Sequence, residues 1–278
     1  MKVLQGLENL WHKRIFHHKS SIMKKIKLVF FVSIIALATT SNAQKKRASE
    51  AQFDLINDYF ESFFIANAPS NVKIKINANW EINYPAASTD RSTDFEITRL
   101  ETPVRWNVSI LGGYMQDVDG GVDVHLFALC HEMAHHLGGT PYKTDEDGKI
   151  RWASMEAQSD YWAAKVCMPK FLKTHPNFLV NRRNIHPEIK RQCAREFYTW
   201  FSNYKICLFT SQAAYQLAKI HDKNRLPSEP ILPDVNPEIP DPSIVNVLDR
   251  NIYPTNQCRF DTAFAGALNR PRPRCWYP

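Results

Sequence analysis

Residues 130–139 read CHEMAHHLGG, and this stretch decides how the rest of the chain is interpreted. His131 and His135 are four residues apart, so on a helix both imidazoles project from one face, about one turn apart. Two histidines at this spacing can share one metal ion, with Glu132 beside the first as a general base. Gly138–Gly139 is expected to end the helix, because glycine readily takes the left-handed conformation of a helix C-terminus. The alternative is an ordinary helix that binds nothing.

A catalytic zinc needs a third protein ligand, and the downstream sequence offers one. The extended pattern HExxHxxGxxH of the metzincins begins correctly with Gly138, but its third ligand falls on Pro141, which cannot coordinate. Further on, EAQSD supplies Glu156 and Asp160, four residues apart on one helical face. A solvated helix face is the alternative, but the order after HExxH favours Glu156 as the third ligand.

The two motifs together, HExxH and ExxxD, resemble the zinc site of gluzincin metallopeptidases, over residues 124–167. The segment WASMEAQSDYWAAKVC is similar to the third-ligand helix of small exported bacterial members. The resemblance implies one zinc ion held by His131, His135 and Glu156. It also implies that Glu132 acts as general base and that Asp160 orients His131.

Peptide hydrolysis is the reaction that such a site serves, and family members add a side chain that stabilises the oxyanion. The motifs do not identify that side chain. The open candidates are His175, His186, His221, Tyr198 and Tyr204.

The pattern of elements predicts an α+β fold, with a small antiparallel sheet packed on the active-site helix and a mostly helical second half, and the resemblance implies that this fold is zincin-like. Helical periodicity is expected over residues 53–64, and alternating residues predict strands within 71–113. Further helices are expected over residues 154–167, 187–203 and 208–223. The strand WNVSILGG before the active-site helix is either a sheet edge that binds extended peptide or an ordinary core strand.

The first 43 residues have the character of a signal peptide. Three lysines follow Met23, an apolar run spans residues 28–38, and the small residues of Ser41-Asn42-Ala43 fit a cleavage site. Met23 is the expected initiator, and an uncleaved anchor is the alternative, although the run is shorter than the ~20 residues of a spanning helix. Residues 1–43 hold seven of the 35 basic and one of the 28 acidic residues, so the mature net charge is near +1 and gives no reason to expect nucleic-acid binding.

All six cysteines lie beyond this leader, and an even number in an exported chain favours disulfides. The absence of a CxxC pair argues against a structural zinc cluster. We expect a metallopeptidase domain over 44–226, a proline-rich strap or linker over 227–243 and a tail over 244–278. Cys258 and Cys275 are the expected bridge, because so short a tail cannot hold itself by a core.

The sequence therefore predicts an exported, periplasmic or secreted, zinc-dependent peptidase, of the endopeptidase class, acting on a peptide or protein substrate. No membrane span is expected after the leader is removed. The alternative is a catalytically silent, disulfide-stapled envelope or binding protein that keeps a metal site. Glu132 argues against that alternative, because a silent site has no chemical need for this carboxylate.

Overall fold

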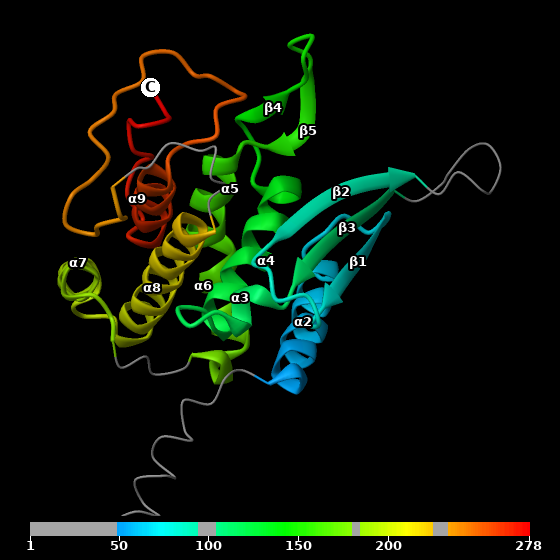
Figure 1. Cartoon of the computed structure of the whole chain (residues 1–278), viewed down its shortest axis with the longest axis horizontal. Coiled ribbons are helices and arrows are strands. Elements are labelled where there is room, and N and C mark those ends of the chain that lie inside the picture. Colours follow the sequence, from blue (N-terminus) through cyan, green and yellow to red (C-terminus); the bar gives the residue numbers. More distant parts are fainter. Residues whose placement is uncertain (1–48, 94–103, 180–183, 225–232) are drawn as a thin grey trace, which may run out of the picture. The chain divides into compact units, whose positions relative to one another are not determined.

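The computed structural model describes residues 49–93, 104–179, 184–224 and 233–278, which belong to one compact unit of mixed α+β class (Figure 1). The expected signal peptide lies outside the described residues. So do residues 94–100 of an expected strand, and Pro227 and Pro230 of the expected strap. Within the described residues no helix is both long enough and apolar enough to cross a bilayer.

A three-stranded sheet precedes the central helix: β1 (Val72–Asn79), β2 (Ala87–Thr93) and β3 (Val104–Leu111), in the order β1-β3-β2. β1 runs parallel to β3 and β2 runs antiparallel to it, so the prediction of an antiparallel sheet is wrong for β1. The reason is the crossover, since β2 follows β1 in sequence but lies on the far side of β3. The strand WNVSILGG is therefore central, which corrects its interpretation as an edge. The edge beside it is β2, whose polar sequence ASTDRST lacks the apolar alternation of a strand.

Helix α4 (Val122–Leu137) lies at the centre of the described structure. It contacts the N-terminal helix α2 (Glu50–Ile65), the sheet and the helices that follow, and it is buried over most of its length. α2 begins at a capping box between Ser49 and Gln52 and packs its phenylalanines into the core. α4 ends as the sequence predicts, with Gly139 in a left-handed conformation at φ 73°.

Between α4 and the next helix the chain forms a hairpin that the sequence analysis missed, β4 (Tyr142–Thr144) and β5 (Ile150–Ser154). Helix α5 (Glu156–Trp162) then continues through a π-helical turn (Ala163–Cys167) into α6 (Met168–Thr174). A disulfide joins Cys130 of α4 to Cys167 of the π-helical turn. The two ligand motifs are therefore tied together covalently.

The second half is mostly helical, as predicted. α7 (Pro187–Phe197) and α8 (Phe201–Lys223) form a pair joined by the disulfide Cys193–Cys207, but the break between them falls at residues 198–200, earlier than expected. α9 (Asn256–Ala267) packs against α5 and α8. Two short elements complete the fold, α3 (Gly113–Gln116) and a 3-10 turn (Pro176–Phe178). The predicted bridge Cys258–Cys275 is confirmed, and it folds the tail back on α9.

Candidate metal centre

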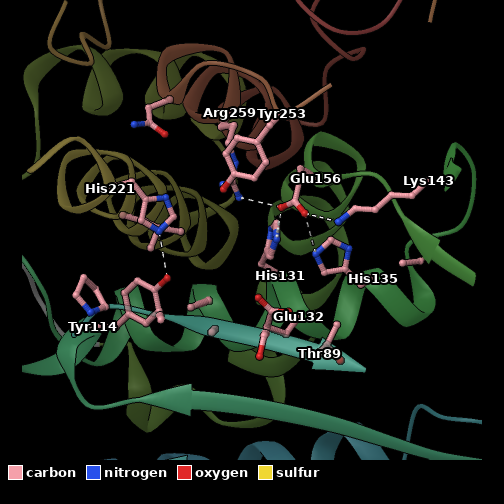
Figure 2. Close-up of a pocket in the computed structure, with 18 of the residues that line it drawn as sticks. Thr89, Tyr114, His131, Glu132, His135, Lys143, Glu156, His221, Tyr253 and Arg259 are labelled. Atoms are coloured by element: carbon pink, nitrogen blue, oxygen red, sulfur yellow. Dashed lines mark hydrogen bonds and ion pairs between the residues drawn. The ribbon is translucent and has the colours of Figure 1, made fainter. Parts of the chain in front are cut away.

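The structure brings His131, His135 and Glu156 to one point, where α4 meets the first turn of α5 (Figure 2). One ligand atom from each lies within 4.8 Å of the others. The Nε2 atoms of His131 and His135 are 3.1 and 3.6 Å from the Glu156 carboxylate. This is the group that the sequence predicts, and its donors are those that bind a metal ion.

The far side of each imidazole is held by a hydrogen bond, so that the Nε2 atoms face the third ligand. His131 donates from Nδ1 to Asp160, at 2.7 Å, and His135 donates from Nδ1 to the carbonyl oxygen of Ser154, at 2.8 Å. When a ring is neutral, donation from Nδ1 leaves its lone pair on Nε2, which is the atom that a metal requires. Burial lowers the pKa of His131, but Asp160 and Glu156 outweigh it and raise that pKa to about 9, so a metal ion must displace the proton on Nε2 of this ring. The donor set therefore fits a metal ion without rearrangement of the rings.

Asp160 is buried and carries a second partner, Arg259 of α9. Arg259 donates to both carboxylate oxygens, from Nε at 2.7 Å and from Nη2 at 3.0 Å. Burial by itself raises the pKa of Asp160, but Arg259 and His131 outweigh it and lower that pKa to about 2. Asp160 is thus a permanently ionised acceptor for the His131 ring.

Glu132 lines the same cavity as the three ligands and is only 6% exposed. Removal from water raises the pKa of Glu132 to about 7, and the neighbouring Glu156 adds to this effect. A carboxylate with a pKa near neutrality can both accept and release a proton at physiological pH. Glu132 is therefore suited to the role of a general base.

The cavity has a volume of about 690 Å³ and is bounded by the edge strand β2, the β4–β5 hairpin, α8 and the tail. On one wall the Tyr114 hydroxyl lies 3.1 Å from His221 Nε2. On another wall Arg259 Nη1 donates a hydrogen bond to the Tyr253 hydroxyl (Figure 2). Of the five histidines and tyrosines considered for the oxyanion, His221 alone lines this cavity.

His136 follows a ligand in sequence but takes no part in the group. Its ring is stacked between Trp106 and Trp152, with ring centroids at 4.5 and 4.7 Å. Nδ1 accepts a hydrogen bond from Arg91 Nε, and Nε2 bonds the Thr89 hydroxyl. These contacts join α4 to β2, β3 and β5, so His136 acts in packing the cavity wall.

Sequence reasoning missed Tyr114, Tyr253 and Arg259. None belongs to a motif, and all three converge on the site only through the packing of α3, α9 and the tail around α4. The one signal in the sequence was Cys258, since a disulfide beside Arg259 indicates that this part of the tail is held in place.

Comparison of the chain with known protein families, with curated proteins and with solved structures yields no match. Its function is therefore inferred from the geometry of the site.

Proposed function

We propose that this chain is an exported zinc-dependent peptidase of the gluzincin type, with a zincin-like arrangement of sheet and active-site helix. The observation that carries the proposal is the convergence of His131, His135 and Glu156 in the cavity that also holds the buried Glu132. Two histidines and a glutamate are a donor set of catalytic zinc, and they leave a position open for water or substrate.

In this proposal each residue around the ligands has one task. Zinc, when bound, supplies a Lewis acid that polarises the scissile carbonyl and acidifies a water molecule. The Glu132 carboxylate accepts the proton of that water and later delivers it to the leaving amine, as its raised pKa permits. Asp160 and the Ser154 carbonyl keep the two histidines oriented.

Two groups that line the cavity are suited to steady the oxyanion. The Tyr253 oxygen accepts a hydrogen bond from Arg259, so its own O–H remains as a donor toward the cavity. On the α8 side, His221 and Tyr114 form a partly buried hydrogen-bonded pair, and removal from water lowers the pKa of His221 to about 3. A neutral donor on either wall serves this role, as preorganised donors do in other hydrolases.

We propose an extended peptide as the substrate, lying along β2. Ser88 and Thr89 of this edge strand line the cavity, and an edge strand can pair with the backbone of an extended chain. Three disulfides, together with the absence of a bilayer-crossing helix among the described residues, are compatible with export. The catalytically silent binding protein remains the second candidate function.

The test is metal analysis of the purified mature protein, paired with casein hydrolysis before and after treatment with a chelator. We expect about one zinc per chain. Activity should disappear with the metal and return when zinc is added back. Glu156→Ala should bind zinc more weakly and hydrolyse casein more slowly, because it removes one of three ligands. A parent protein that takes up no metal overturns the proposal, and one that holds zinc but cleaves no peptide supports the silent alternative.

A further inference from the structure

The tail packs against α5, the helix that carries both Glu156 and Asp160. We call residues 253–276 the C-terminal clamp, because they contact this short helix from its first turn to its end. Arg272 Nε donates to the Gln158 side chain at 2.8 Å, and the Tyr161 hydroxyl donates to the Arg270 carbonyl at 2.6 Å. Gln158 in turn donates to the carbonyl of Gly138, at the end of α4.

Arg259 makes the contact of this clamp that lies nearest to the metal ligands. Its side chain is 7% exposed, and it meets the 3% exposed side chain of Asp160 in a two-point ion pair. A second Arg259 contact reaches Glu156, at 3.7 Å. A planar guanidinium that bonds both oxygens of a carboxylate fixes the orientation of that carboxylate. The orientation of Asp160, and through it the His131 ring, therefore depends on where α9 lies.

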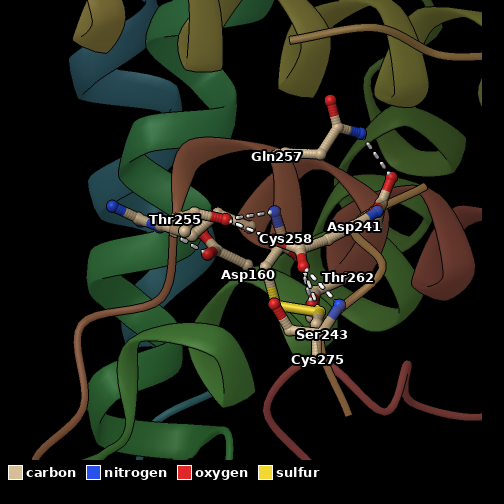
Figure 3. The surroundings of a disulfide bond; sticks show 10 residues. Asp160, Asp241, Ser243, Thr255, Gln257, Cys258, Thr262 and Cys275 are labelled. Atoms are coloured by element: carbon tan, nitrogen blue, oxygen red, sulfur yellow. Dashed lines mark hydrogen bonds and ion pairs between the residues drawn. A yellow bond between two sulfur atoms is a disulfide. The ribbon is translucent and has the colours of Figure 1, made fainter. Parts of the chain in front are cut away.

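A small apolar cluster also joins the clamp to the residues on either side of Glu156 in the sequence. Met155 and Ala157, the two neighbours of this ligand, pack with Trp276 and with the disulfide Cys258–Cys275. Trp276 is fully buried. Figure 3 shows the disulfide with Asp160 among its surroundings. The disulfide thus links Cys258, which precedes Arg259, to Cys275, which precedes Trp276. Trp276 in turn packs against the two sequence neighbours of Glu156.

The packing of α9 on α5 is close at Gly266. A Cβ added there would lie 2.6 Å from the Tyr161 carbonyl oxygen and 3.2 Å from the Ala164 side chain. The absence of a side chain lets the two helices approach, which is a role that only glycine fills. Polar, ionic, apolar and steric contacts therefore all set the same position of the clamp on α5.

We infer that the C-terminal clamp is part of the metal centre, with Arg259 as a positioning residue for Asp160 and His131 and the Cys258–Cys275 disulfide as the tie that keeps Arg259 in place. This inference rests on the proposed function, since it concerns affinity for the same metal. Groups that orient a metal ligand from outside typically change metal affinity by about 10–100-fold. Arg259 reaches His131 only through Asp160, and its direct contact with Glu156 is the longer one, at 3.7 Å. We expect effects at the lower end of that range.

The experiment compares zinc affinity, measured by chelator competition, across matched variants of the full mature chain. Arg259→Met should weaken zinc binding about 10-fold, and Arg259→Lys should recover part of that loss because it keeps the charge but not the two-point geometry. Cys258→Ala with Cys275→Ala should weaken binding about 3–10-fold. Cys193→Ala with Cys207→Ala removes the disulfide between α7 and α8 and is the control, with expected affinity unchanged.

Two further readouts separate positioning from general instability. The visible spectrum of the cobalt-loaded protein reports ligand geometry, and it should shift in Arg259→Met but not in the Cys193/Cys207 control. Backbone hydrogen exchange of metal-free protein should become faster in α5 for Arg259→Met and for the Cys258/Cys275 pair. Parent-like affinity, spectrum and exchange in these variants would overturn the inference. If the parent binds no metal, the proposed function fails, and exchange in α5 alone decides whether the clamp holds this helix.

Discussion

The two sides of the metal centre are encoded in different ways. On one side, α4 and α5 carry the candidate ligands and the proposed base in two short motifs whose spacing follows from one turn of helix. On the other side, the C-terminal clamp carries Arg259, which pairs with Asp160 across 99 residues of sequence and belongs to no motif. Candidate ligands on one helix face can be recognised from a short stretch of sequence. The residues that hold those ligands in position come from distant parts of the chain and cannot be recognised in this way.

This difference also separates what each side is expected to do. The α4–α5 side holds the candidate metal ligands and the proposed general base, so its loss should abolish the proposed reaction or the metal binding outright. The clamp reaches the candidate ligands through Asp160, through the longer contact of Arg259 with Glu156, and through the apolar neighbours of Glu156. Its loss should change stability and affinity by graded amounts.

The largest expected effect lies on the α4–α5 side. Glu132→Gln should lower the rate of casein hydrolysis by about 10²–10⁴-fold, because an amide cannot accept the water proton. Zinc content should stay at the parent level, since residue 132 is not a ligand. Assays of activity and metal on the same preparation measure both. Glu196→Gln, at a surface ion pair with Arg270, is the control. A Glu132→Gln enzyme with the parent rate would remove the assigned mechanism.

On the clamp side, the largest expected effect is on folding. Trp276→Ala should lower the free energy of unfolding by about 3–5 kcal/mol, because it empties a fully buried site. Trp200→Ala is a matched control, since this tryptophan is 66% exposed and its removal should change stability by no more than about 0.5 kcal/mol. Urea denaturation followed by circular dichroism measures both. Equal stability of the two variants would mean that the clamp contributes nothing to the folded unit.

Asp160 contacts both His131 on the α4–α5 side and Arg259 of the clamp. Its replacement therefore tests whether the clamp acts on the candidate ligands through this carboxylate. Asp160→Ala should weaken zinc binding by about 10–100-fold through the lost orientation of His131. It should also destabilise the protein by about 3–5 kcal/mol, because Arg259 is left buried without its partner. Asp160→Ala combined with Arg259→Met should recover part of that stability but not the affinity. Chelator competition and urea denaturation give the two numbers. Additive losses of stability would contradict the direct pairing.

The smallest expected effect concerns the pH dependence of the clamp. Burial raises the pKa of Asp261, on α9, from 3.8 to about 6. Between these two values the folded chain keeps a proton that the unfolded chain has lost. The unfolding free energy should therefore fall as the pH rises from 4 to 6, by roughly 1–3 kcal/mol. Asp261→Asn should flatten this dependence relative to the parent, whereas the exposed Asp54→Asn should not. The unfolding free energy of each variant is measured by denaturation across this pH range. If Asp261 does not cause the dependence, the profiles of Asp261→Asn and of the parent will be parallel.

The fold was predictable where the apolar and turn residues of a short segment match the positions that are buried or turned in the structure. The helix at residues 53–64, the end of α4 at the glycines and the bridge Cys258–Cys275 follow from periodicity, turn chemistry and the length of the tail. Strand β2 was not predictable, because an edge strand is stabilised by pairing with β3 and its polar sequence shows no apolar alternation. The parallel pairing of β1 with β3 depends on which strands become neighbours, which no local pattern encodes.

Local sequence was enough to identify the candidate ligands His131, His135 and Glu156 and the orienting Asp160, because each motif follows a helical spacing that needs no tertiary information. It also predicts disulfides, since six cysteines follow the expected signal peptide. The tertiary structure alone decided that Tyr253 and Arg259 line the same cavity and that Trp276 packs against the neighbours of Glu156. The physical reason is that burial and ion pairing depend on which distant segments pack together, and that packing is a property of the whole chain.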